Sequence, residues 1–449
     1  MRNLTDILLR TLQEGSTESR VARGSAGTLS LKIGARALSF FTAIILGRLL
    51  GAAGYGAYSW AMATVGLLLV FALAGFERLL VREVAVHRAR REWGLLRGLL
   101  RSADIVTFSL AVILALLAMA LLLLFRSAFE PAIVSALLLA LPALPLLTLM
   151  GVKQSTLQGF ERVATGQIPG LLILPGLLFL FIVGVPLLTG RPLTTLMAVG
   201  LHVAAAAAAL AGALLLLRGV VPGEVTEAAP VYRTRSWLSA ALPLLLVSSM
   251  IMLNQRIDIL MLGAIAGSEV TGIYTAAHRG AELVSFILKS VSPVLAPLVA
   301  ALYAAGETER LQRIATKSAR VMLLLTLPVG VVMILFGRWF LLLFGPEFAA
   351  GGTALTILTA GHLFSTAIGL VGMILIMSGH DRDAAATFAA CGVLNIILNA
   401  LLIPRWGLNG AAVATTVSLL AWNIVLTLLL HRRLGITAHP FRSLTPPRG

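Results

Sequence analysis

The sequence has one cysteine, few aromatic residues and little charge. Of its 449 residues, 12% are charged and 6% are aromatic, whereas soluble domains carry about 25% charged residues. Because Cys391 stands alone, an intrachain disulfide and a cysteine metal site are excluded. The chain also lacks a glycine-rich phosphate loop, a metal-ligand spacing and a loop-borne catalytic triad. We therefore expect no enzyme activity, no metal site and no cofactor.

Apolar residues, in contrast, are abundant: they make up 58% of the chain, and the mean hydropathy is +0.95. Continuous apolar runs of about 20 residues recur, which is the length of a helix that crosses a bilayer. Runs without strict alternation favour helices over a membrane barrel. The sequence thus predicts an all-α polytopic membrane protein with about twelve transmembrane helices, near residues 27–50, 55–76, 104–125, 131–151, 166–188, 193–217, 238–262, 271–300, 318–337, 353–378, 384–403 and 408–430.

Basic residues follow these spans in a regular alternation. Of the 35 Lys and Arg residues, 25 lie in the termini or in even-numbered links and at their borders, four lie in odd-numbered links and six lie further inside spans. By the positive-inside rule, both termini face the cytoplasm, and we expect a multi-pass protein of the cytoplasmic membrane of a prokaryote. The basic residues of the cytoplasmic links and termini face anionic lipid and account for most of the net charge of +16. We therefore expect no nucleic-acid partner.

Polar stretches divide the chain into five parts. Leu4, Ile7, Leu8 and Leu12 recur at helical spacing, so residues 1–26 are either an amphipathic helix on the cytoplasmic membrane surface or a frayed tail, with no cleavable signal peptide. Residues 218–237 form a polar cytoplasmic linker between an N-lobe at 27–217 and a C-lobe at 238–430. A basic cytoplasmic tail follows at 431–449.

The two halves carry matching motifs in the same order. Gly56-Ala-Tyr58-Ser59 of the first half returns in the second half as Gly272-Ile-Tyr274-Thr275. Three further matches keep nearly the same offset in numbering: Ser102 with Ser318, Gly159 with Gly379, and Pro186 with Pro404. We infer an internal duplication. Because six helices per lobe is an even number, both lobes enter the membrane in the same orientation, as parallel repeats related by a pseudo-two-fold axis along the membrane normal.

Ionisable side chains inside the spans are the candidate functional residues, since each costs a few kcal/mol in a bilayer and needs a reason. Basic residues outnumber acidic residues inside the spans. A cavity lined mainly by basic side chains would bind an anionic head group. The substrate-binding candidates are Arg36, Arg48, Arg256, Arg279 and Lys289; the candidates for proton or sodium coupling are Asp258 and Glu282.

Structural explanations compete with these roles. Lys32, Arg36 and Arg48 lie near span ends and could extend to the membrane interface. Arg279 and Glu282 are three residues apart on one helix, so they could form a local ion pair. Asp258 shares a helix face with Asn254, whereas Arg256 points elsewhere. Each of the two charges on this helix therefore needs a partner from another helix.

Several motifs together indicate a family. They are GRLLGAAGYGAYSWA at 47–61, FALAGFERLLVREVA at 71–85, Asp258-x-x-Met-Leu-Gly263, and IPRWGLNGAAVATTVS at 403–418. This set resembles the polysaccharide-biosynthesis flippases of the multidrug/oligosaccharidyl-lipid/polysaccharide exporter superfamily. The resemblance implies two six-helix lobes in a V shape around a central cavity. It also implies transfer of an oligosaccharide on a lipid, usually undecaprenyl pyrophosphate, between leaflets.

We therefore expect a flippase for lipid-linked oligosaccharides that works by alternating access. Its partners would be membrane lipid, the lipid-linked glycan, and a glycan polymerase or glycosyltransferase, with a monomer as the expected state. Two alternatives stay open. A multidrug extruder of the same superfamily would need a carboxylate-rich, aromatic cavity. A scaffold that does not transport would function with its cavity charges neutralised.

Overall fold

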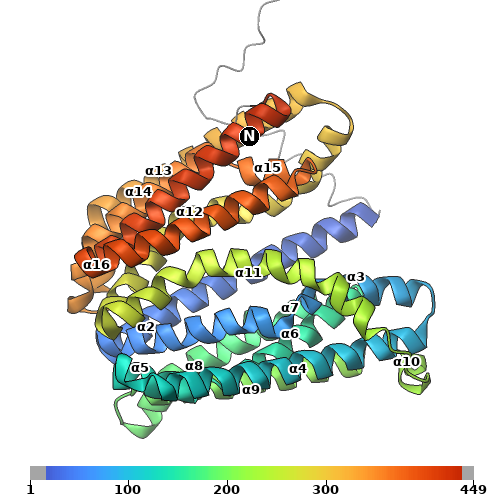
Figure 1. The fold of residues 1–449 in the computed structure, drawn as a ribbon, viewed down its shortest axis with the longest axis horizontal. Coiled ribbons are helices and arrows are strands. Elements are labelled where there is room, and N and C mark those ends of the chain that lie inside the picture. Colours follow the sequence, from blue (N-terminus) through green and yellow to red (C-terminus); the bar gives the residue numbers. More distant parts are fainter. Residues whose placement is uncertain (1–16, 437–449) are drawn as a thin grey trace, which may run out of the picture. The chain divides into compact units, whose positions relative to one another are not determined.

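The computed structural model describes residues 17–436, and within that range the chain is helical and contains no strand (Figure 1). The all-α prediction is thereby confirmed. Of the predicted segment 1–26 and tail 431–449, residues 1–16 and 437–449 lie outside the described residues. The main helices of the first half are α2 (Thr17–Leu73), α3 (Phe76–Ala89), α4 (Trp93–Leu124), α5 (Pro131–Ala140), α6 (Ala143–Gly159), α7 (Val163–Ile168), α8 (Leu174–Thr189), α9 (Thr195–Arg218) and α10 (Gly223–Glu227).

The second half is built in the same way. Its helices are α11 (Thr234–Ile265), α12 (Gly267–Ala304), α13 (Thr308–Leu342), α14 (Gly352–Ile368), α15 (Val371–Met377) and α16 (Asp381–Leu434). Between α13 and α14 lies a short 3-10 helix, η3 (Pro346–Gly351). Between α7 and α8 the chain makes a π-helical turn that begins at Pro169, where proline supplies no N–H to a regular helical ladder.

Within the described residues, each of the twelve predicted spans can be placed on these helices. Six stretches are long and apolar enough to cross a membrane alone, and three bent helix pairs pass the same test together. Two of the six, α2 and α16, hold an internal kink and contain two spans each. The remaining span is α12, whose 38 residues include the charges of the predicted eighth span.

Glycines with positive φ mark matching turns in the two halves. Gly51 (φ 68) and Gly267 (φ 85) lie between the first and second helices of their halves. Gly190 (φ 64) and Gly407 (φ 53) lie between the fifth and sixth. Residues with a Cβ avoid this conformation. The backbone therefore repeats with nearly the same offset as the motifs, in agreement with the duplication predicted from them.

The first compact unit comprises the described part of α2 up to Ile45 together with Val65–Leu124 and Leu138–Ser248. Its core holds Phe76 and Leu79 of α3, Leu96 and Leu99 of α4, and Trp237 at the start of α11, all buried. The linker lies in this unit along α4: Val231 donates its N–H to Gly94 O at 2.9 Å. Arg97 donates Nη1 to Ala228 O at 2.7 Å. The linker is therefore fixed to α4 rather than free.

The second compact unit comprises Leu46–Thr64, Phe125–Leu137 and the described residues from Ser249 on. Helices α12, α13, α14 and α16 pack on one another around buried residues such as Met322, Leu375 and Leu426. The unit thus includes two segments of the predicted N-lobe. For Leu46–Thr64 the reason is local, since Gly56 lets α2 approach the backbone of α12 closely. The lobe boundaries at 27–217 and 238–430 stay predictions.

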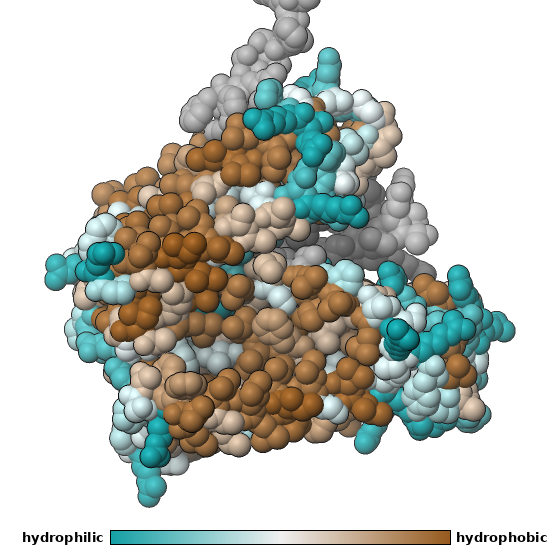
Figure 2. Space-filling view, in the orientation of Figure 1, coloured by the Kyte–Doolittle hydropathy of each residue, from teal (hydrophilic) through white to brown (hydrophobic). Residues whose placement is uncertain are grey.

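Apolar side chains cover the exposed sides of the helices, as expected for surfaces that face lipid. Ile113, Leu124 and Leu215 are each more than half exposed. In Figure 2 hydrophobic residues spread over α4 and α9, and hydrophilic ones gather at the end where α3 and α10 lie. Soluble monomers rarely expose large apolar surfaces of this kind. The chain is a multi-pass membrane protein.

The fixed linker leads to a first prediction. A Cβ on Gly98 would lie 1.9 Å from Val231 O, so Gly98→Ala should displace the linker from α4. We expect tryptic cleavage after the exposed Arg233 to become about tenfold faster in detergent, since cleavage tracks the population of the open form. Gly219→Ala is the matched control, because nothing lies within 4 Å of an added Cβ there. Equal cleavage rates in the two variants would contradict the fixed linker.

Candidate functional site

Asp258 of α11 lies in a buried polar cluster of the second unit and is 3% exposed. Tyr274 of α12 donates its hydroxyl to Asp258 Oδ2. Thr415 Oγ1 of α16 lies 3.4 Å from the same oxygen, and Ile259 donates its N–H to Oδ1 at 2.9 Å. Burying a charge is costly without hydrogen bonds. Hydroxyl groups from two other helices, α12 and α16, thus surround a carboxylate that could bind and release a proton or hold a hard cation.

Two histidines extend this cluster along α12. The ring centroids of Tyr274 and His278 are 5.9 Å apart. Those of His278 and His362, which lies on α14, are 6.4 Å apart. Asp258, Tyr274, His278 and His362 therefore form a row of titratable groups across three helices, α11, α12 and α14. Such a row could pass a proton between neighbours, because imidazole both donates and accepts.

The other charges of α12 lie further along the same helix. Lys289 Nζ and Glu282 Oε1 form an ion pair at 3.0 Å. Arg279 is half-buried and interacts electrostatically with Glu282 and with Tyr55 and Tyr58 of α2. The positive charge of Arg279 thus lies among hydroxyl groups and one carboxylate. A phosphate group could replace these partners, since arginine binds phosphate through paired hydrogen bonds.

The remaining candidates have different surroundings. Arg256 is half-buried on α11, while Arg36 is exposed on the part of α2 that belongs to the first unit. Arg48 is exposed and donates Nε to Leu343 O at 2.9 Å, just after the end of α13. This bond satisfies a carbonyl that the helix end leaves free. The structure thus gives Arg48 an internal partner, and its role toward substrate stays a prediction.

Sequence spacing did not identify the partners of Asp258. Tyr274 and Thr415 both stood inside motifs that we used for the repeat and for the family resemblance. Their contact with a carboxylate on another helix leaves no local pattern. Asn254, which shares a face with Asp258, makes a different contact, since it donates Nδ2 to Phe388 O at 3.2 Å. Among the described residues, no group of three His, Cys, Asp or Glu side chains could hold a metal ion.

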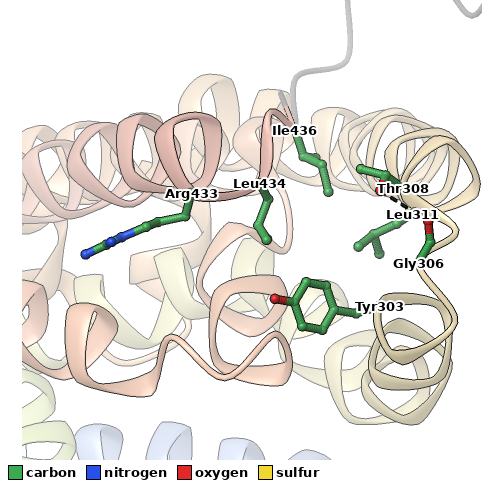
Figure 3. Close-up of a pocket in the computed structure, with 7 residues that line it drawn as sticks. All are labelled: Tyr303, Gly306, Thr308, Leu311, Arg433, Leu434 and Ile436. Atoms are coloured by element: carbon green, nitrogen blue, oxygen red, sulfur yellow. Dashed lines mark hydrogen bonds between the residues drawn. The ribbon is translucent and has the colours of Figure 1, made fainter.

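The second unit also has a cavity of about 300 Å³ at the ends of α12, α13 and α16. None of the candidate residues lines it. Its polar lining includes Arg433, which donates Nε to Asp383 Oδ2 at 3.0 Å. Figure 3 shows the lining residues: Tyr303, Gly306, Thr308, Leu311, Arg433, Leu434 and Ile436. We therefore place the candidate site at the Asp258 cluster and the charged stretch of α12.

Parts of the chain are similar to known proteins. The chain is 27% identical over 173 residues to the probable flippase AglR of Haloferax volcanii. That match covers 38% of this chain and 36% of AglR, so the chain spans little more than a third of this relative's length. Residues 243–401 also match the profile of the MatE family.

Solved structures share the fold. An inward-facing multidrug resistance MATE family transporter of the MOP superfamily aligns with a TM-score of 0.72 at 16% identity, over 92% of this chain and 98% of that one. The lipid II flippase MurJ, in an inward closed conformation, aligns with a TM-score of 0.70 at 13% identity, over 90% of this chain and 87% of that one. The family profile described as polysaccharide biosynthesis protein matches residues 21–303. Because this match covers more than half of the sequence, the chain belongs to the polysaccharide biosynthesis protein family.

Proposed function

We propose that this protein moves a lipid-linked oligosaccharide, carried on a lipid of the undecaprenyl-pyrophosphate type, from the inner to the outer leaflet by alternating access. The family membership carries this proposal. The probable flippase AglR, to which part of the chain is similar, gives it further support. The cytoplasmic membrane of a prokaryote is the proposed location, with both termini inside, because the basic links alternate with links poor in charge. A monomer acting beside a glycan polymerase or glycosyltransferase is the proposed assembly.

Basic side chains would supply the affinity for the head group. Arg256, Arg279 and Lys289 lie on two neighbouring elements of sequence, α11 and α12, and Arg36 and Arg48 would add charge along α2. A pyrophosphate must shed water to enter an apolar surrounding, and charge-assisted hydrogen bonds offset that loss. Lys289 is paired with Glu282 at 3.0 Å. Exchange of this internal carboxylate for phosphate would couple binding to a rearrangement on α12.

Asp258 and Glu282 are the proposed coupling residues, for a proton or for sodium. Asp258 is the more enclosed of the two, and Tyr274 already occupies one of its oxygens. Protonation of Asp258 would remove its charge and weaken its hold on Tyr274 and Thr415, which lie on α12 and α16. Ion binding would thereby act on the packing of three helices at once, as a coupled transporter requires.

The test is glycan export in a host that lacks its own flippase. We expect the wild-type chain to restore surface glycan, and Arg256→Ala and Arg279→Ala to lower export at least about tenfold, the equivalent of losing one charge-assisted bond. Arg313→Ala, an exposed basic residue of α13, is the matched control. All variants are compared at equal membrane levels. Full export by both span variants would show that these arginines are structural.

A second candidate function is multidrug extrusion, favoured by the MatE match over residues 243–401. An extruder of cations should confer resistance to cationic drugs and should depend on carboxylates rather than on arginines. If the chain restores no glycan in several hosts but confers such resistance, this second function replaces the first.

A further inference from the structure

The two repeats touch through their backbones at one place in the second unit. A Cβ on Gly56 of α2 would lie 1.8 Å from Ser268 O and 2.7 Å from Gly272 N of α12. In return, a Cβ on Gly272 would lie 2.0 Å from Ala52 O. Gly56 and Gly272 occupy equivalent positions of the two repeats, as do Ala52 and Ser268. Gly56 therefore approaches Ser268, and its equivalent Gly272 approaches Ala52, the equivalent of Ser268. A two-fold axis between the repeats produces such an exchange of equivalent contacts. We call this the glycine contact.

A pair of glutamates flanks the glycine contact in the same reciprocal way. Glu130, in the link before α5 of the first repeat, accepts the N–H of Ser268 of the second repeat at 3.0 Å. Glu347, in η3 of the second repeat, accepts the N–H of Ala52 of the first repeat at 3.2 Å. The two glutamates differ by only one position from exact equivalence in the repeats. Each carboxylate therefore crosses to the other repeat.

The N–H groups that the two glutamates accept, those of Ala52 and Ser268, each lie at the start of a helical segment. Ala52 directly follows the kink at Gly51, and Ser268 directly follows Gly267. The first N–H groups of a helix have no partner inside it and carry partial positive charge. The two turn glycines also make room for the carboxylates: a Cβ on Gly267 would lie 2.3 Å from Glu130 Oε1, and one on Gly51 would lie 3.3 Å from Glu347 Oε1.

The exposure of these groups makes the contact reversible. Both glutamates are exposed, whereas Ala52 and Ser268 are buried. Water can therefore replace the helix N–H as partner of each carboxylate, so both glutamates keep a hydrogen-bond partner when the contact separates. Charge-assisted bonds of this kind are nevertheless about twice as strong as neutral ones. Two of them, arranged symmetrically, suit a contact that must form and separate in each transport cycle.

We propose that Glu130 and Glu347 are reciprocal latch residues that hold the two repeats together at the glycine contact, and that both must leave their helix N-termini before substrate is released. The glycine contact lies beside the links at 51–54 and 263–270, which hold no Lys or Arg; this is the outer side in the orientation proposed above. The latch rests on that proposed function, because alternating access requires one end to close while the other is open.

Labelling of a buried cysteine tests the latch without any measurement of transport. In a Cys391→Ala background, Ser59→Cys provides a reporter, since Ser59 is buried one helical turn beyond Gly56. Intact cells are exposed to a membrane-impermeant maleimide. We expect slow labelling of the background and a rise of about tenfold with Glu130→Ala or with Glu347→Ala, the equivalent of about 1.4 kcal/mol. The double variant should label faster still. Glu130→Gln, which keeps an acceptor oxygen but no charge, should be intermediate.

Two controls separate the latch from the proposed function. Glu269→Gln removes an exposed charge beside Ser268 and should leave labelling unchanged. Thr189→Cys, exposed at the C-terminal end of α8, should label from outside in every variant. If it labels and the glutamate variants match the background, the latch is wrong. If Thr189→Cys labels only in inverted vesicles, the proposed orientation is wrong, and the same comparison in those vesicles decides on the latch.

Discussion

Gly56→Ala should lower glycan export to less than about a tenth of the wild-type level, although it adds only one methyl group. The added Cβ would lie 1.8 Å from the backbone oxygen of Ser268. Backbone atoms on both sides of the contact leave no flexible side chain to move away. The two repeats must therefore separate at the glycine contact, and the closed state of that end is lost. Export in the flippase-deficient host and Ser59→Cys labelling measure the two consequences.

Helix propensity alone predicts the opposite result for Gly56→Ala. Inside a helix, glycine is less favourable than alanine by about 1 kcal/mol, so without the contact Gly56→Ala should raise stability and leave export intact. Gly184→Ala on α8 is the matched control, because nothing lies within 4 Å of its added Cβ. We expect Gly184→Ala to export normally. Normal export by Gly56→Ala, at equal membrane levels, would remove the contact from the transport cycle.

The pseudo-two-fold relation adds an internal check. Gly272→Ala places a Cβ 2.0 Å from Ala52 O and should match Gly56→Ala in both export and labelling. Because both substitutions open the same contact, the double variant should be no worse than either single one. Such strong non-additivity is expected for residues that share one contact. Independent, additive losses would indicate two unrelated packing defects instead.

The helices themselves were predictable from the sequence, because the bilayer fixes their length and their composition together. Two of the turns were marked in the sequence: Gly190 and Gly407 closely follow the matched Pro186 and Pro404, and both adopt positive φ. The repeat could be recognised for the same reason. A turn that only glycine tolerates keeps its glycine in both copies.

The grouping of helices could not be predicted in this way. Leu46–Thr64 packs with the second unit because Gly56 meets backbone atoms of Ser268 and Gly272, in the other half of the chain. Hydropathy measures how apolar a segment is, but it does not indicate which helix the segment packs against. The latch glutamates were missed for a related reason. Glu130 and Glu347 lie in short polar links. The search for functional charges considered those inside spans, because a charge in the bilayer costs free energy.

The candidate site was predictable in residue type and unpredictable in contacts. Asp258 stood out as a carboxylate in an apolar run, yet Tyr274 and Thr415 lie 16 and 157 residues further along the chain. Glu282 interacts with Arg279, as the three-residue spacing had suggested, and it also forms an ion pair with Lys289, seven residues on. Long side chains bridge two helical turns, so spacing alone does not choose the partner.

Asp258→Asn should abolish ion-coupled transport while leaving the protein in the membrane. The asparagine side chain has nearly the same shape, and its carbonyl oxygen can still accept the hydroxyl of Tyr274, which the carboxylate accepts now. It loses the charge and with it the ability to bind a proton or sodium ion at neutral pH. We expect export to fall at least about a hundredfold, the equivalent of about 2.7 kcal/mol. Ion flux driven by substrate, measured with an internal pH or sodium dye in proteoliposomes, should disappear.

Two further variants decide what Asp258 does. Tyr274→Phe removes the hydroxyl partner but keeps the carboxylate near Thr415, so ion flux should persist at a reduced rate. Glu282→Gln breaks the pair with Lys289 and tests the other proposed coupling residue. If Asp258→Asn keeps ion-dependent transport and Glu282→Gln loses it, the coupling role passes to Glu282. The buried cluster would then be a structural contact that fastens α11 to α12 and α16, and its loss should appear as a lower melting temperature rather than as uncoupled transport.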